Sequence, residues 1–190
     1  AIIDKGFKIV QDVKPGGIFL INCQWKPEEV GQHLDAAAKK YIAENNIQLY
    51  IIDAIDLCAK IGMGKRTNTT LQSAFFSLAE VLPKADAIKY MKDAATKSYL
   101  KKGQNIVDMN HKAIDAGADA LVKIDVPAEW ANPAADAEKA PLEGPEALVK
   151  QVKNILLPID NMDGDSLPVS AFMPHVDGEW ELGASGDEKR

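Results

Sequence analysis

The sequence predicts an α/β fold, a layered and mostly parallel or mixed sheet flanked by helices, with an extended connector at the C-terminal end. Short apolar runs with turn residues before them indicate strands at GGIFLIN (16–22), IQLYIID (47–53) and ADALVKID (118–125). Near-continuous hydrophobicity is typical of strands covered on both faces, as in a parallel sheet. Helical patterns separate these runs, and only 6% of the residues are aromatic. This order favours α/β layering.

The helices of the first half follow from periodicity and from end signals. Pro27 suits a first helical turn, which predicts a helix up to Asn45. A short helix over 54–61 can end at Gly62, a residue that adopts a left-handed conformation at low cost. A further amphipathic helix begins at Thr69 or Thr70 and ends at Pro83. Its apolar stripe is expected to be Leu71, Ala74, Phe75, Leu78, Ala79 and Leu82.

The second half contains three more predicted helices and a change of composition. The helices cover 85–100, 104–117 and 145–157, the last opened by a proline. Residues 127–144 are rich in alanine and proline and predict a linker. From residue 158 the chain is rich in Gly, Pro and Asp without a helical period. We therefore expect a domain over 1–157, and over 158–190 a connector that docks on something larger.

Composition excludes several classes of function. The net charge is −6 without a long basic block, which argues against a nucleic-acid partner. No apolar run is long enough to span a membrane and the first residues lack a signal-peptide core, so we expect a cytoplasmic protein. Cys23 and Cys58 form no C-x-x-C and are expected to be buried thiols. His33, His111 and His175 lack metal-ligand spacing, so we predict neither a metal site nor a catalytic residue.

The stretch GMGKRTNTTLQSAFFSLAEVL (62–82) is the candidate binding site. It fails the P-loop pattern twice, because Ala59 stands where the first glycine is needed and Arg66 follows Lys65 in place of a hydroxyl residue. A glycine turn still brings Lys65, Arg66 and Asn68 to a helix N-terminus, where backbone N–H groups and the helix dipole favour an anion. The alternative is structural, with Gly62 closing one helix, Asn68 or Thr69 capping the next, and two solvated cations.

Several segments together resemble one family. VKPGGIFLIN, LYIIDAIDLCAKIGMGKRTNTTLQSAFFSLAEVLP, AIKYMKDAATKSYLKKGQNIVDMNHKAIDAG and GDSLPVSAFMPHVDGEWELGASGDEKR resemble, in this order, the γ-type domain of pyruvate:ferredoxin (or flavodoxin) oxidoreductases. The most specific patterns are G-x-G-x-R-x-N-x-x-x-Q-x-A-F-F (62–76) and K-K-G-x-x-I-V-x-M-N (101–110). The end of the chain is similar to the family's lead-in to a ferredoxin-like domain.

The resemblance implies an enzyme that oxidatively decarboxylates pyruvate, transfers the acyl group to coenzyme A and passes electrons to ferredoxin or flavodoxin. Such enzymes use thiamine diphosphate, Mg²⁺ and [4Fe–4S] clusters, and are cytosolic and usually dimeric. This chain lacks the thiamine-binding domains, the cluster cysteines and the family's earlier Gly-Ser-Asp-Gly-Thr-Val-Gly-like stretch. We therefore expect 1–157 to be a partial γ-type domain that binds no cofactor and is inactive alone.

The resemblance also places the candidate cofactor-binding residues. The family motif covers Gly62, Gly64, Arg66, Asn68 and Gln72, and Lys65 adds a second cation. They would meet the phosphates of coenzyme A, or else fix contacts with other domains of the same enzyme. A stand-alone anion- or nucleotide-binding module and an inert interdomain scaffold are the remaining alternatives.

Overall fold

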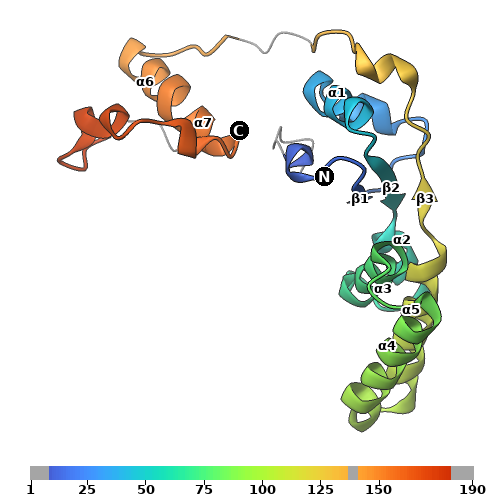
Figure 1. Ribbon diagram of the computed structural model, residues 1–190. Helices are drawn as coiled ribbons and strands as arrows, with labels where there is room; N and C mark the ends of the chain where they lie inside the picture. The colour runs from blue at the N-terminus through green and yellow to red at the C-terminus, as the bar shows by residue number, and fades with distance from the viewer. Residues whose placement is uncertain (1–8, 137–140, 181–190) are drawn as a thin grey trace. The chain divides into compact units, whose positions relative to one another are not determined.

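The computed structural model describes residues 9–136 and 141–180. Its contacts divide the chain into two compact units, one over 10–133 and a second that contains Ile9 and the described residues from 134 onward (Figure 1). Each unit is described by itself. The candidate site lies entirely in the first unit.

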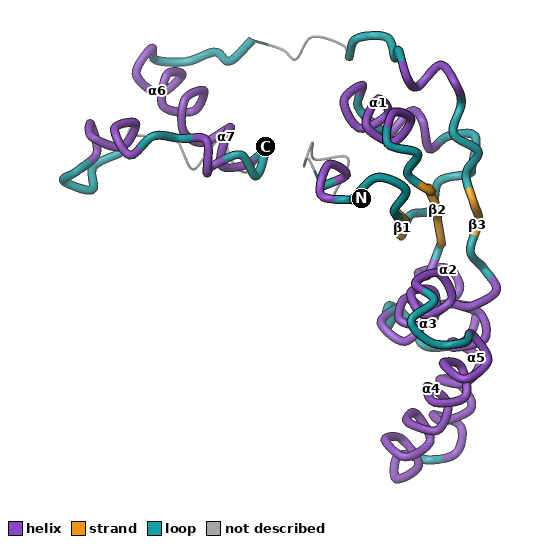
Figure 2. The backbone as a smooth tube through the Cα atoms, viewed as in Figure 1, coloured by secondary structure: helices purple, strands orange, loops and turns teal. Residues whose placement is uncertain are grey.

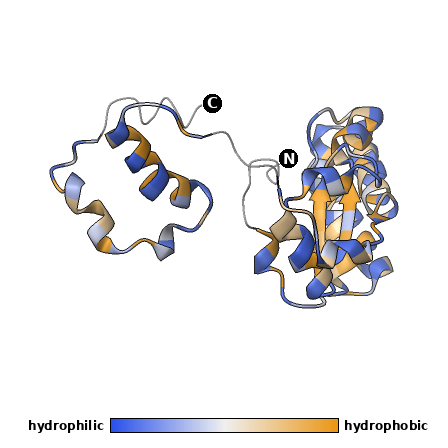
Figure 3. Cartoon of the chain, turned by 90° about the horizontal axis from the view of Figure 1, so that it is seen from above, coloured by the Kyte–Doolittle hydropathy of each residue, from blue (hydrophilic) through white to orange (hydrophobic). Residues whose placement is uncertain are grey.

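The sheet of the first unit is small and mixed. β1 (Ile18–Asn22) pairs in parallel with β2 (Gln48–Ile52), and β3 (Val122–Lys123) pairs antiparallel with the other edge of β2. Figure 3 shows the apolar strands inside this unit, and Leu49 and Ile52 in the central strand are almost fully buried. The mixed α/β class is confirmed. The strand expected over 118–125 is reduced to two residues, since Ala118 and Asp119 belong to α5, and it pairs antiparallel, which makes the sheet mixed.

The helix α1 (Ala36–Glu44) starts nine residues later than Pro27 suggested. Asp35 takes the N-cap position, and its Oδ1 accepts a hydrogen bond from the Ala38 N–H at 2.6 Å. Before it, the chain forms a 3-10 helix, Val30–His33, and then Leu34 is extended. An aspartate cap satisfies an otherwise unpaired N–H, so it sets the start of the helix more strongly than the proline does.

Replacing Asp35 by alanine should therefore lower the free energy of unfolding by about 1 kcal/mol, the usual cost of losing such a cap. Urea unfolding of the chain measures this change. Glu44→Ala, at the other end of α1, is the matched control. Equal stability of the two variants would show that the cap bond contributes nothing.

The remaining helices of the first unit gather beyond the carboxyl end of β2 (Figures 1 and 2). α2 follows β2 directly, and α5 packs against three of its neighbours. Short 3-10 helices complete this unit. The bounds are α2 (Ala54–Ile61), α3 (Asn68–Ala79), α4 (Lys84–Tyr99) and α5 (Gln104–Asp119), with 3-10 helices at Val10–Asp12, Leu100–Lys102 and Ala128–Ala131.

Polar side chains fix α2 to the sheet edge. Asn22, the last residue of β1, accepts the Ala54 N–H through Oδ1 at 3.1 Å, and the Asp53 carboxylate accepts the Asp56 N–H at 2.9 Å. Gly62 closes the helix with φ of 90°, in the left-handed region. The predicted end of this helix at Gly62 is confirmed. The loop that follows thus begins at the end of α2 that lies away from β2 in the chain.

The buried face of α3 differs from the expected apolar stripe. Its fully buried residues are Thr70, Ser73 and Ala74, whereas the side chain of Phe75 is 53% exposed. The cause is the close approach of α5, since a Cβ at Gly117 would clash with the carbonyl oxygen of Thr70. Only small side chains fit between backbones that lie this close. Of the expected stripe, Ala74 is buried and Leu71 and Leu78 are half-buried, so the prediction is wrong for Phe75, Ala79 and Leu82, which are exposed.

The second unit is built from short helical segments. Residue 158 onward contains helical turns up to His175, where an extended chain was expected. The division at 157 into domain and connector stays a prediction, and residues 181–190 of the expected connector lie outside the described residues. The segments are α6 (Glu146–Gln151), a π-helical segment (Val152–Leu156), α7 (Leu157–Asp160) and 3-10 helices at Gly164–Ser166 and Val169–His175.

Candidate functional site

The loop over residues 62–67 joins α2 to α3 and carries most of the predicted site. Gly62 and Gly64 both have positive φ, 90° and 60°. Between them the chain turns, and the Arg66 N–H donates to the Met63 carbonyl oxygen at 3.3 Å. Such backbone geometry favours glycine, since other L-residues meet their own backbone there. The two glycines therefore shape the turn that presents the cations.

The cations of this loop lie on the surface. Lys65 and Arg66 are exposed, and within the described part of the chain no carboxylate forms an ion pair with either of them. Lys60, one helix earlier, behaves differently. Its ammonium lies 2.6 Å from the Asp56 carboxylate, and this hydrogen bond raises the pKa of Lys60. The loop thus offers two cations whose charges are not neutralised by a neighbouring side chain.

The underside of the loop is held by a buried thiol. Cys58 Sγ lies 3.3 Å from the Arg66 carbonyl oxygen, to which it can donate, and 3.2 Å from Thr70 Oγ1. Both Cys58 and Thr70 are fully buried. Cys23 is buried as well, so the expectation of two buried thiols is confirmed. The backbone of Arg66 is thereby fixed while its side chain stays exposed.

The start of α3 lacks a side-chain cap. The helix begins at Asn68, and its N-cap residue Thr67 makes no side-chain capping bond. The alternative in which Asn68 or Thr69 caps this helix is therefore wrong, because both lie within its first turn. Uncapped N–H groups at a helix start carry partial positive charge, which favours an anion beside Lys65 and Arg66.

A groove of about 320 Å³ lies next to this loop, between α3, α4 and α5. Gln72 lines it, together with Thr69 from the preceding turn and Asn110 from α5. Its wall is mainly apolar, with Phe76, Leu82, Tyr90 and Met91. The structure thus divides the predicted residues. Gly62, Gly64, Lys65, Arg66 and Asn68 belong to the loop and the start of α3, and Gln72 belongs to the groove.

Asn68 and Gln72 connect the two parts. They are four residues apart on α3 and both are exposed, so they lie on one face of this helix. Sequence reasoning missed Thr69 and Asn110 as site residues. A usable signal was present, since Asn110 is a polar residue three positions after buried Val107 and four before buried Ile114. A polar side chain in a buried stripe usually has a specific partner.

The histidines occupy structural positions. His111 Nε2 lies 2.9 Å from Thr96 Oγ1 and links α5 to α4. His33 stacks on Trp25 and His175 on Trp180, with ring centroids 4.0 and 4.2 Å apart. Over the described ranges, no three His, Cys, Asp or Glu side chains gather as metal ligands. Among those same residues no helix is both long and apolar enough to cross a bilayer.

Fold and loop together define an α/β domain with a mixed sheet and an exposed cationic loop between α2 and α3. Comparison with protein families matches residues 2–120 to the model described as pyruvate ferredoxin/flavodoxin oxidoreductase. The chain belongs to the pyruvate ferredoxin/flavodoxin oxidoreductase family, which confirms the resemblance of its motifs. A second model, described as a domain of unknown function, matches residues 137–190.

Individual relatives agree with this assignment. A pyruvate-flavodoxin oxidoreductase of Enterobacter agglomerans and a pyruvate:ferredoxin oxidoreductase of Moorella thermoacetica are each 42% identical over 97% of the chain. A mitochondrial pyruvate dehydrogenase [NADP(+)] of Euglena gracilis is 31% identical over 98% of it. The chain spans only 15% of the length of the first two relatives and 10% of the third.

Proposed function

We propose that the chain acts as one domain of a larger 2-oxoacid oxidoreductase, and that its 62–67 loop and the start of α3 contact coenzyme A. In the whole enzyme, pyruvate would lose CO₂, its acyl group would form a thioester with the sulfur of coenzyme A, and a pair of electrons would pass to ferredoxin or flavodoxin. The observation that carries the ligand proposal is the pairing of two exposed, unneutralised cations with an uncapped helix start. The diphosphate and 3′-phosphate of coenzyme A need such donors.

The names of the relatives support a role in the common part of the reaction. All three specify pyruvate, but their acceptors differ: flavodoxin, ferredoxin and NADP(+). The same segment is present in each. We infer that this chain serves a step that does not depend on which acceptor takes the electrons, and acyl transfer to coenzyme A is such a step.

The redox and decarboxylation chemistry would belong to other domains. A [4Fe–4S] cluster takes four thiolates, whereas the chain has two cysteines, both buried and far from forming such a set. The residues present therefore do not fit a cluster. Thiamine diphosphate and Mg²⁺ would likewise be held outside this chain, and the enzyme would be a cytoplasmic dimer. Catalytic activity would require the whole enzyme.

The coenzyme A role is tested in the full-length enzyme by replacing loop residues and measuring the KM for coenzyme A and for pyruvate separately. A selective rise in the KM for coenzyme A supports the proposal. An unchanged KM and an unchanged kcat would remove it.

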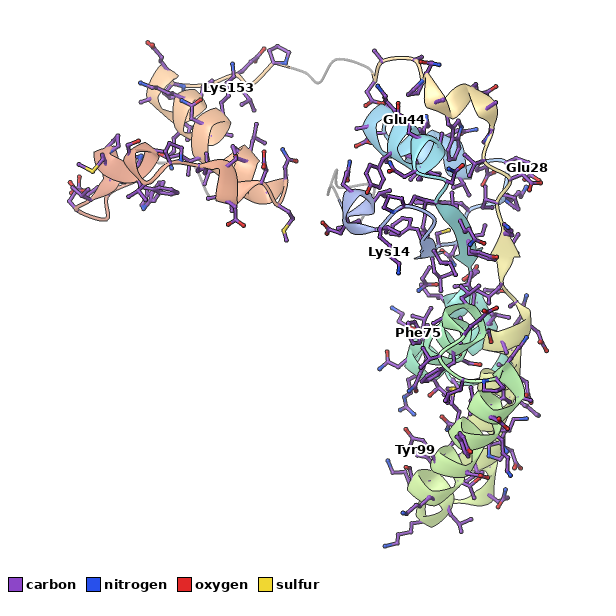
Figure 4. All side chains as sticks on the ribbon, in the orientation of Figure 1. Lys14, Glu28, Glu44, Phe75, Tyr99 and Lys153 are labelled. Atoms are coloured by element: carbon purple, nitrogen blue, oxygen red, sulfur yellow. The ribbon has the colours of Figure 1, made fainter. Side chains whose placement is uncertain are left out.

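A second candidate function, contact with neighbouring domains, is favoured by exposed apolar side chains on α3 and in the wall of the groove. Phe75, Leu82 and Tyr90 are 53%, 38% and 59% exposed, and Phe75 is labelled on α3 in Figure 4. Exposed apolar side chains that gather in this way mark interaction surfaces. The other 85% of a full-length relative would supply the covering domain.

Replacing Phe75 by serine in the full-length enzyme should therefore loosen the contact and increase protease cleavage and amide exchange in residues 68–90. Leu100→Ser is the matched control, because Leu100 is similarly exposed, at 55%, but lies beyond the end of α4. Equal protection in the two variants would argue that no domain covers Phe75. If another domain covers the surface around Phe75, the backbone amide of Phe75 should also exchange faster in the isolated chain than in the whole enzyme.

A further inference from the structure

A polar seam joins the start of α3 to α5. Thr69 Oγ1 lies 3.4 Å from Asn110 Oδ1, to which it donates. One helical turn later, Ser73 Oγ donates to the Ile114 carbonyl oxygen at 2.5 Å. Figure 1 shows the two helices side by side, in agreement with their contacts. The seam thus has two links at matching positions, and the Thr69 link is the one nearer the cationic loop.

The Asn110 amide is held in one orientation. Asn110 is 4% exposed, and its Nδ2 donates to the Ile106 carbonyl oxygen at 2.8 Å. This bond turns the Oδ1 acceptor towards Thr69. An asparagine fixed within its own helix in this way is a rigid anchor for a residue of another helix. The anchor also lines the groove, together with Thr69 and Gln72.

The position of Thr69 makes this link consequential. It is the second residue of α3, directly after Asn68 and three residues after Arg66. The adjacent residue, Thr70, contacts the Cys58 thiol, which also contacts the Arg66 carbonyl oxygen. The first turn of α3 is therefore held from two sides, by α2 through Cys58 and by α5 through Asn110. Loss of the Thr69 link weakens the hold of α5 on this turn, so that more orientations of the turn are populated while Gly117 still packs against Thr70.

We infer that Thr69 and Asn110 are positioning residues that orient the first turn of α3, and with it Arg66 and Asn68, for coenzyme A. This inference rests on the proposed function of the loop. Neither residue needs to touch the ligand. Together they reduce the number of loop orientations that are populated before binding, which lowers the entropic cost of binding.

The test compares Thr69→Val, which removes the hydroxyl with little change of shape, with Thr69→Ser, which keeps it. In the full-length enzyme, Thr69→Val should raise the KM for coenzyme A about fivefold, the factor that the loss of one hydrogen bond corresponds to. The KM for pyruvate should not change. The KM for coenzyme A of Thr69→Ser should stay within about twofold of the wild-type value. Amide exchange of residues 66–71 should be faster in Thr69→Val alone.

Ser73→Ala is the control for a purely structural effect, because it removes the other link of the same seam. It should lower the thermal stability while the KM for coenzyme A stays as in the wild type. If Ser73→Ala raises this KM as much as Thr69→Val does, the seam is merely structural and the inference is wrong. If Thr69→Val changes neither amide exchange nor this KM while substitution of Arg66 still raises it, only the positioning inference fails. If exchange is faster and no loop variant changes the KM, the coenzyme A role of the loop fails instead.

Discussion

Replacing Arg66 and Asn68 together by alanine should raise the KM for coenzyme A about a hundredfold in the full-length enzyme and leave the KM for pyruvate unchanged. A hydrogen bond to a charged group contributes about 1.5–3 kcal/mol, and a loss of 1.4 kcal/mol is a factor of ten in affinity. The loss of a guanidinium–phosphate contact and of one amide donor therefore adds up to about two factors of ten. Initial rates at varied coenzyme A, with saturating pyruvate, give this value directly.

Two comparison variants make this result specific. Lys97→Ala removes an exposed cation from α4 and should leave both KM values unchanged, which excludes an effect of net charge. Arg66→Lys keeps the charge but loses the planar, two-pronged donor, so its KM should lie between those of the wild type and the double variant. A rise in the KM for pyruvate of the same size would instead indicate a disturbed domain interface.

Local signals in the sequence were sufficient for the loop and for the central elements of the fold. Gly62 ends α2 in the left-handed conformation that its position suggested, and the two apolar runs before it pair in parallel. The first feature depends on residues close in sequence, and the second joins strands thirty positions apart, each of which is marked by its own apolar run. The start of α1 is also set by a local residue, the cap Asp35, but Pro27 offered a competing start signal earlier in the chain. The length and direction of β3 were not predictable in the same way, since they depend on pairing across more than seventy residues.

The candidate site was predictable only as far as it is local. The five residues of the loop and the start of α3 are consecutive or nearly so, and they do lie together. The groove is different, because Asn110 reaches Thr69 across 41 positions of the chain. The exposure of the Phe75 side chain could not be predicted from the sequence either. Periodicity shows that a helix has an apolar side, but the small residues at the crossing with α5 decide which side is buried.

Replacing Gly117 by alanine should lower the free energy of unfolding by about 2 kcal/mol, because a clash with backbone puts the overpacking cost near about 3 kcal/mol, the upper end of its usual range. Two effects oppose each other here. Alanine gains about 1 kcal/mol of helix propensity over glycine. The new Cβ, however, would clash with the carbonyl oxygen of Thr70, a backbone atom that cannot move aside as a flexible side chain can. The cost of the clash therefore exceeds the gain in helix propensity, and α3 and α5 must separate.

Urea unfolding of the chain measures this loss, and Gly164→Ala serves as the control, since a Cβ at Gly164 would meet its nearest neighbour at an ordinary 3.6 Å. A Gly117→Ala variant as stable as the wild type would mean that the two helices do not approach as closely as the structure shows.

The separation of α3 from α5 in Gly117→Ala should also have a functional effect, because it moves Asn110 away from Thr69 and so loosens the first turn of α3. In the full-length enzyme, Gly117→Ala should therefore raise the KM for coenzyme A more than Ser73→Ala does. A destabilised variant with an unchanged KM would show that Cys58 alone is enough to hold the loop in place.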